Sequence, residues 1–200
     1  MDNKLIVLAG ATGNLGGRIA RALLQRGAGV IALVRHGSAP GKVEELRTLG
    51  ATIAEVDFSR LATVTSACSG ASCVVSALSG LREVNVDSQT LLFEAALEAG
   101  VQRFIPSDYC IDFTKLPPGT NRNLDLRREF RDRVDGAPLA ATSIFNGAFT
   151  EMRSPAGQRT DHLDRGQSRE GNSVMPSLFK PCGLSPSAFK SIRRAGVIER

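Results

Sequence analysis

Three glycines spaced three residues apart follow a short apolar run near the start of the chain and open an amphipathic stretch. The segment from Leu5 to Gly27 reads LIVLAGATGNLGGRIARALLQRG, with the three glycines at Gly10, Gly13 and Gly16. Such a segment predicts a strand that turns sharply into a helix, whose N-terminal N–H groups attract anions. It is typical of a turn that binds the pyrophosphate of a dinucleotide. The alternative is an α/β scaffold with a tight but empty turn.

Each glycine has an expected role. Gly10 lets the chain turn after the strand, Gly13 lets the backbone approach a pyrophosphate, and Gly16 lets the helix pack closely. Side chains in the same turn can add hydrogen bonds. The predicted cofactor contacts from this turn are Gly10, Thr12, Gly13, Asn14, Leu15 and Gly16.

Short apolar strands alternate with helical periods as far as about residue 152. The expected strands are 5–9, 29–34, 52–56, 73–77, 103–106 and 141–145, and the expected helices are 14–25, 42–49, 62–67, 86–99 and 123–134. Nearly all-apolar strands that alternate with helices indicate a parallel sheet covered on both faces. We therefore predict a doubly wound α/β domain, a Rossmann-type sheet of six strands, over residues 1–152.

The last 48 residues have a different composition. Residues 153–200 are rich in Arg, Ser, Gly and Pro and carry the whole net charge of +5, since residues 1–152 hold 16 basic and 16 acidic side chains. Such a composition buries little surface to offset chain entropy, so we expect a mostly disordered basic tail. Because the predicted domain has no net charge, the basic pI gives little support to nucleic-acid binding.

Membrane and secretory features are missing from the sequence pattern. No apolar run approaches the ~20 residues of a membrane span, and the chain starts without a secretory signal pattern. The four cysteines, Cys68, Cys73, Cys110 and Cys182, show neither a CxxC pair nor zinc-like spacing. We expect a cytoplasmic protein with reduced thiols and no metal site.

The residues after the second strand indicate which dinucleotide is preferred. NAD binders place an acidic residue there for the ribose, whereas NADP binders place an arginine near the 2′-phosphate. Here Arg35 and His36 follow the strand directly, and no acidic residue lies between positions 29 and 43. The fork of donors on Arg35 suits a phosphate, so we predict NADP(H) rather than NAD(H). His36 is either a cofactor contact or a solvated side chain.

Later loops at the carboxyl ends of the strands are expected to close over the cofactor. Asp57 and Phe58 follow the third strand, where the adenine would lie. Ser76, Ala77 and Leu78 follow or end the fourth strand, near the expected ribose and nicotinamide. These assignments depend more on position than on residue type, and ordinary loop residues are the alternative.

The combination of GATGNLG, Arg35, RFIPSDY and ATSIFNGAF resembles the NmrA-like and isoflavone-reductase-like proteins, which are atypical short-chain dehydrogenase/reductases. The resemblance covers about Lys4 to Met152 and implies an NADP(H)-binding domain followed by a smaller substrate-binding portion. Some members reduce small organic molecules by hydride transfer, and others are thought to sense the cofactor and bind regulatory proteins. The family pattern stops near Arg153, as a truncation, a frameshift or a misassigned end would produce.

The usual proton-relay residues of this class are missing. Tyr109 is the only tyrosine, and Phe113 replaces the lysine of a Tyr-x-x-x-Lys motif. By resemblance, a lysine is also expected on the helix before the sixth strand, where this chain has Arg127 and Arg128. We therefore consider Tyr109, Ser107 and Arg127 as catalytic candidates. Lys115, from the loop after the fifth strand, is a further one.

Three functions remain open at this point. The first is an NADPH-dependent reductase of a small organic substrate. The second is a non-catalytic NADP(H) sensor that regulates a partner protein, which the missing lysine favours. The third is a truncated, inactive nucleotide-binding remnant, which the abrupt change at residue 153 favours.

Overall fold

The computed structural model describes residues 4–147, 149 and 197–199. The chain divides into two units, and the fold below is that of the first, which comprises residues 1–147 and 197–200. The predicted boundary at residue 152 lies outside the described residues. No helix within the described part is long and apolar enough to cross a membrane.

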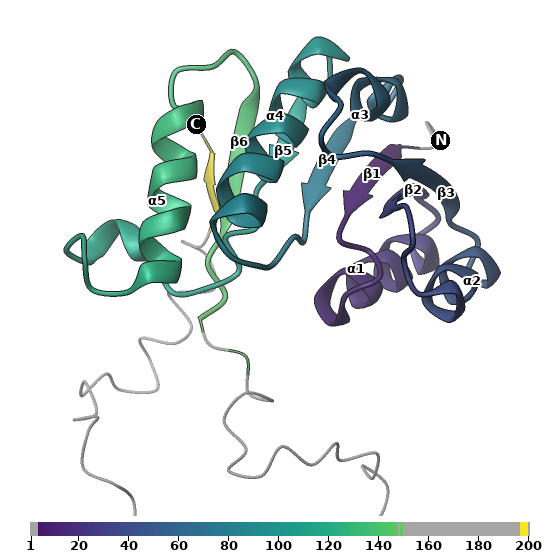
Figure 1. The fold of residues 1–200 in the computed structure, drawn as a ribbon, viewed down its shortest axis with the longest axis horizontal. Helices are drawn as coiled ribbons and strands as arrows, with labels where there is room; N and C mark the ends of the chain where they lie inside the picture. Colours follow the sequence, from purple (N-terminus) through teal and green to yellow (C-terminus); the bar gives the residue numbers. More distant parts are fainter. Residues whose placement is uncertain (1–3, 148, 150–196, 200) are drawn as a thin grey trace, which may run out of the picture. The chain divides into compact units, whose positions relative to one another are not determined.

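Six parallel strands form the sheet (Figure 1). They are β1 (Leu5–Ala9), β2 (Gly29–Arg35), β3 (Thr52–Val56), β4 (Cys73–Ser76), β5 (Arg103–Ile105) and β6 (Ala140–Ile144). Their order is β3-β2-β1-β4-β5-β6, so the chain crosses from one edge back to the middle between β3 and β4. The predicted doubly wound parallel sheet is confirmed. The carboxyl ends of β1 and β4 therefore lie side by side, where such sheets bind ligands.

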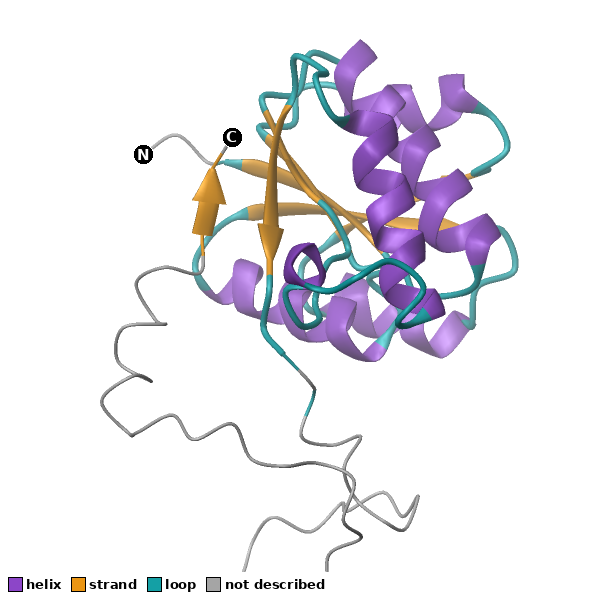
Figure 2. Ribbon diagram, turned by 90° about the vertical axis from the view of Figure 1, so that its left-hand side faces the viewer, coloured by secondary structure: helices purple, strands orange, loops and turns teal. Residues whose placement is uncertain are grey.

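Helices cover both faces of the sheet (Figure 2). On one face, α1 (Asn14–Gln25) and α2 (Pro40–Thr48) pack on Leu8, Ala32 and Val75. On the other, α3 (Leu61–Cys68), α4 (Gln89–Glu98) and α5 (Arg122–Val134) pack on the alternate strand residues, including Val7 and Val74. The apolar strands are thus buried on both sides, as their composition predicts.

Three phenylalanines join α4 and α5 to the sheet. The ring of Phe93 on α4 lies edge-on to Phe104 on β5, with centroids 5.2 Å apart, and 6.4 Å from Phe130 on α5. All three side chains are less than 5% exposed. Edge-to-face packing of this kind adds to the stabilisation from burial. Phe130 therefore marks the face of α5 that points into the core.

Three elements were not expected from the sequence. The stretch predicted as a helix over 86–99 begins instead with a π-helix, η1 (Glu83–Ser88), that leads into α4. A 3₁₀ turn, η2 (Phe113–Lys115), follows β5. A short strand, β7 (Val197–Glu199), pairs antiparallel with β6 and makes a seventh strand. β7 is a short strand within the tail that the sequence predicts to be mostly disordered; residues 153–196 lie outside the described residues.

Candidate dinucleotide site

The turn between β1 and α1 leaves no room for side chains at two of its glycines. Gly10 has a φ of +80°, and a Cβ atom there would lie 2.5 Å from the carbonyl oxygen of Ala77. A Cβ at Gly16 would lie 2.0 Å from the carbonyl oxygen of Gly10. Both distances are shorter than any real contact, so the fold itself requires these two glycines. The helix packs closely on the turn, and the turn packs on the end of β4.

Gly13 differs from the other two glycines. It precedes α1 with φ −78°, a value open to any residue, and no side chain caps the helix N-terminus. A Cβ there would meet only the carbonyl oxygen of Gly10, at 3.2 Å. The fold therefore needs glycine less at this position than at Gly10 or Gly16. Free space beside an uncapped, positively polarised helix N-terminus suits an anion.

A cavity of about 200 Å³ opens at this turn. Its walls come from the carboxyl ends of β1, β2, β3 and β4 and from η1. It is lined by Gly10, Thr12, Gly13, Leu33, Val34, Arg35, Ser38, Phe58, Ala77, Leu78, Ser79, Val84 and Ser88. Seven of these lining residues were predicted as cofactor contacts, namely Gly10, Thr12, Gly13, Arg35, Phe58, Ala77 and Leu78.

Five predicted cofactor residues do not line the cavity, namely Asn14, Leu15, Gly16, Asp57 and Ser76. Gly16 is buried against the turn, and Ser76 is 0% exposed. The exposed Asp57 accepts hydrogen bonds from the backbone N–H and the hydroxyl of Ser59, at 2.8 and 2.7 Å. These two bonds lower the pKa of the Asp57 carboxyl, and the bond from the Ser59 hydroxyl has the larger effect. Asp57 thus orders its own loop.

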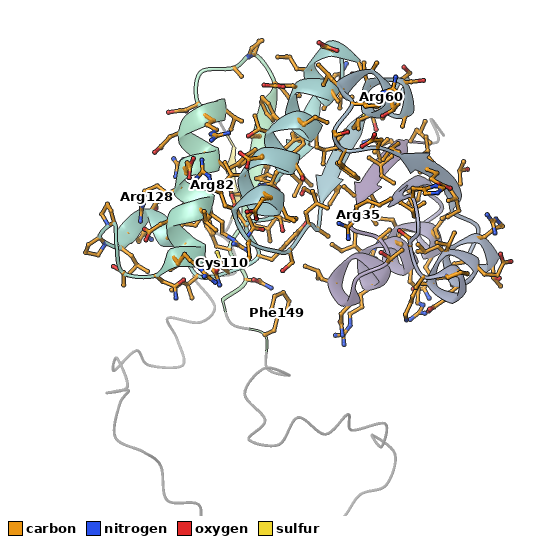
Figure 3. All side chains as sticks on the ribbon, viewed as in Figure 1. Arg35, Arg60, Arg82, Cys110, Arg128 and Phe149 are labelled. Carbon is orange, nitrogen blue, oxygen red and sulfur yellow. The ribbon has the colours of Figure 1, made fainter. Side chains whose placement is uncertain are left out.

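Arg35 ends β2 and stands at the rim of this cavity (Figure 3). Its guanidinium makes no hydrogen bond or ion pair with the rest of the described chain. A second cavity of about 570 Å³ continues on its other side, lined also by Ser38 and Arg47. Neither Ser38 nor Arg47 was predicted as a cofactor contact, because Ser38 lies three residues beyond the strand and Arg47 comes from α2. His36 lines neither cavity, and its Nδ1 pairs with the carboxylate of Glu55.

The catalytic candidates lie after β5 and on α5. Ser107 is 6% exposed, and its hydroxyl donates to the carbonyl oxygen of Leu78 at 2.6 Å. Burial raises the pKa of the Tyr109 phenol to about 12, so the phenol is protonated at neutral pH and can donate a proton or a hydrogen bond. Arg127 donates to the carbonyl oxygen of Asn123 in the preceding turn of α5, at 3.2 Å.

Asp108 lies between two of these candidates in sequence and is 1% exposed. Its Oδ2 accepts from the hydroxyl of Ser143 on β6 at 2.7 Å, while its Oδ1 is buried without a hydrogen-bond partner among the described residues. Burial raises the pKa of this carboxyl. The sequence singled out the PSDY string for its resemblance but gave no role to this aspartate.

Two other basic residues, Arg128 and the further candidate Lys115, have structural partners. Arg128 donates to the carbonyl oxygens of Phe113 and Leu116, at 2.9 and 3.0 Å, and its guanidinium lies over the Phe113 ring. It therefore ties the η2 turn to α5. Lys115 pairs with Asp112 at 3.1 Å on an exposed part of the same turn. Figure 3 shows Arg128 on the α5 side of the unit, far from Arg35.

The comparisons with known proteins agree with this arrangement. The chain matches the NmrA-like family over residues 2–151. It belongs to that family. The predicted resemblance is therefore confirmed, and it includes the stretch that forms the sheet and the glycine turn.

Relatives of this NmrA-like chain include reductases. Pinoresinol reductase 1 of Arabidopsis thaliana is 36% identical over an alignment of 156 residues, which covers 72% of this chain and 49% of that protein. The structure described as AtPrR2 with NADP+ and (+)pinoresinol is 31% identical, with a TM-score of 0.68, over 76% of this chain and 52% of that one. A crystal structure of isoflavone reductase is 25% identical, with a TM-score of 0.67, over 85% and 57%.

The NmrA-like chain spans about half the length of the relatives it matches. The matched half contains the glycine turn, Arg35 and the cavity between them. The other half of those relatives has no counterpart in the match.

Proposed function

We propose that this chain binds NADP(H) and serves as the cofactor-binding part of a reductase that acts on a small organic substrate. The observation that carries the proposal is the glycine turn, which opens at Gly13 onto a cavity whose rim holds Arg35. The described residues fit the cofactor, because Gly10 and Gly16 bring the helix N-terminus close to the sheet while Gly13 leaves space for phosphate.

In this proposal each part of the cavity binds one part of the dinucleotide. The N–H groups at the start of α1 hold the pyrophosphate, with Thr12, Asn14 and Leu15 beside it. Arg35 holds the 2′-phosphate, and Phe58 borders the adenine. Ala77 and Leu78 border the nicotinamide half. Bound NADPH supplies a hydride, and the protonated phenol of Tyr109 is the candidate proton donor.

The relatives suggest which substrates to test first. The names of the matched proteins include reductases of pinoresinol and isoflavones, so small phenolic molecules are the first class to screen. We infer a cytoplasmic location and no role for nucleic acid, as the composition predicts.

Calorimetric titration with NADPH, and with NADH in parallel, tests the proposal. We expect binding of NADPH and weaker binding of NADH. Equal affinity for NADPH and NADH would contradict the proposed binding of the 2′-phosphate by Arg35. No binding to either would contradict the proposal and favour the third reading, an inactive remnant.

A non-catalytic NADP(H) sensor is the second candidate function. It is favoured by the engagement of the Ser107 hydroxyl with Leu78 and of Lys115 with Asp112, which leaves Tyr109 and Arg127 as catalytic candidates. A sensor must bind NADP+ and NADPH with different affinities, because equal affinities leave no free energy for a switch. Titration with both forms, followed by assays of NADPH oxidation, distinguishes the sensor from the reductase.

A further inference from the structure

Polar side chains, one of them buried, hold the segment between β4 and α4 through hydrogen bonds to its backbone. Asn85, in the π-helix η1, is 5% exposed, and its Nδ2 donates to the carbonyl oxygen of Gly80 at 2.6 Å. The hydroxyl of Ser88 donates to the carbonyl oxygen of Glu83 at 2.8 Å. π-helical turns inside α-helices are frequent at functional sites. Here the π-helical turn is itself part of the cavity wall, through Val84 and Ser88.

Gln89 follows this turn and is 1% exposed, in a helix face that is otherwise apolar. Its Nε2 donates to the carbonyl oxygen of Asn85 at 3.2 Å, and its Oε1 accepts from the backbone N–H of Ser107 at 2.9 Å. A buried amide costs free energy unless it is hydrogen-bonded, and an apolar residue would avoid that cost. The amide instead connects α4 to the loop that follows β5.

Ser107 extends this connection to the cavity. Its hydroxyl donates to the carbonyl oxygen of Leu78 at 2.6 Å. Leu78 lines the cavity, and its neighbour Ala77 donates through its N–H to the carbonyl oxygen of Ala9, at the end of β1. Three hydrogen bonds, two buried and one partly buried, thus run from Asn85 through Gln89 and Ser107 to the cavity wall.

The sheet order shows which half of a dinucleotide would meet this wall. Arg35 ends β2, the glycine turn follows β1, and Leu78 follows β4, so the three lie in that order across the sheet. A dinucleotide with its 2′-phosphate at Arg35 and its pyrophosphate at Gly13 extends its nicotinamide half towards Leu78.

We propose that Gln89 and Ser107 are positioning residues, which hold the Leu78 loop in the place where it borders the nicotinamide half of the cofactor. This inference rests on the proposed binding of NADP(H). It also gives Ser107 a role that does not require contact with the substrate.

The test compares two ligands that share one end. NADPH carries both halves, whereas 2′,5′-ADP carries only the adenosine half with its phosphates. The variants are Ser107→Ala, which removes the bond to Leu78, and Gln89→Leu, which removes the acceptor for Ser107. Gln89→Glu keeps that acceptor. Thr90→Val is the matched control, because the hydroxyl of Thr90 is buried on the same helix without a partner among the described residues.

We expect Ser107→Ala and Gln89→Leu to weaken NADPH binding by about threefold to tenfold, the effect of one lost hydrogen bond. Binding of 2′,5′-ADP should stay within about twofold of wild type, since its contacts lie at Arg35 and Gly13. Gln89→Glu should recover part of the NADPH affinity, and Thr90→Val should bind both ligands as wild type does. Should Gln89→Leu fail to fold, Ser107→Ala tests the same connection alone.

Unchanged NADPH affinity in Ser107→Ala and Gln89→Leu would overturn the positioning role while leaving the proposed function intact. An equal loss for both ligands would also overturn it, because the bonds would then support the fold in general. A wild-type protein that binds no NADPH would overturn the proposed function, and this inference with it.

Discussion

The carbonyl oxygen of Gly10 occupies the place where a side chain at Gly16 would begin, with 2.0 Å between that oxygen and an ideal Cβ. The contact is between two backbone segments, the β1–α1 turn and the first turn of α1, and neither moves without the other. One residue in this turn, Gly13, is outside that constraint. This difference separates what the fold requires from what a ligand requires.

We expect Gly16→Ala to destabilise the protein and Gly13→Ala to leave it nearly as stable as wild type. The first adds a Cβ that overlaps backbone, at a cost of at least about 1–3 kcal/mol. The second adds a Cβ at 3.2 Å from one oxygen, in a backbone conformation that alanine adopts freely. Thermal unfolding measures both. Although Gly13→Ala stays folded, it should weaken NADPH binding. Wild-type affinity in this variant would contradict a pyrophosphate site at Gly13.

Arg35→Ala should weaken the binding of NADPH and leave that of NADH unchanged. A hydrogen bond to a charged group contributes about 1.5–3 kcal/mol, which corresponds to a tenfold to hundredfold loss. Arg26→Ala is the control, because Arg26 caps the far end of α1 through a bond to the carbonyl oxygen of Ala22. Calorimetry with both dinucleotides measures the effect. A similar loss for NADH would show that Arg35 binds a part common to both.

The native phenol of Tyr109 should ionise with a midpoint at about 12, because burial raises its pKa from the ordinary value near 10. The chain has one tyrosine and no tryptophan, so phenolate absorbance reports this side chain alone. A raised pKa means that the unfolded state loses its proton first as the pH rises. Stability is therefore fully present below pH ~10 and is lost as the pH approaches 12.

The alkaline loss of stability should be smaller in Tyr109→Phe, once the thiols are accounted for. Burial also raises the pKa of Cys68 and of Cys73 to about 11, so these groups add a loss that begins near pH 9. A native titration midpoint near 10 would contradict the burial of Tyr109. The phenol would still be protonated at neutral pH, as an ordinary tyrosine is.

Arg128→Ala should destabilise the protein by about 1–3 kcal/mol, the cost of leaving hydrogen-bonding groups without their charged partner. The carbonyl oxygen of Leu116 loses the Arg128 donor, and that of Phe113 keeps only the backbone N–H of Leu116, at 3.3 Å. Arg122→Ala, at the exposed start of the same helix, should change stability by less than about 0.5 kcal/mol. Denaturant unfolding gives both values. Equal effects would show that the bonds to the η2 turn contribute nothing measurable.

Local signals predicted the elements next to the glycine turn well. The helix predicted over 14–25 is α1, with the same bounds, because glycines mark both of its ends. Arg35 stands where the sequence placed it, since a residue directly after a strand has little freedom of position. The strands agree to within one residue for the same reason, as short apolar runs bounded by turn residues have few alternative ends.

The remaining features depend on contacts that are distant in sequence. The π-helix η1 has the same apolar pattern as an α-helix, so periodicity does not separate the two. Gln89 finds its acceptor role at Ser107, 18 residues away, and only the fold brings them together. β7 is three residues long and pairs with β6, more than fifty residues earlier, in a stretch whose composition favours disorder. A glutamine in an otherwise apolar helix face is the local signal that could have pointed to the bond between Gln89 and Ser107.

The crossing of the chain between β3 and β4 has a consequence for folding. The cavity takes one wall from residues before this crossing, including Arg35 and Phe58, and another from residues after it, including Leu78 and Val84. Neither half of the chain has a complete cavity of its own. A bound dinucleotide would therefore join two segments that local contacts alone leave separate. Amide hydrogen exchange should slow on both sides of the crossing at once, and ligand affinity would then report how cooperatively the halves fold.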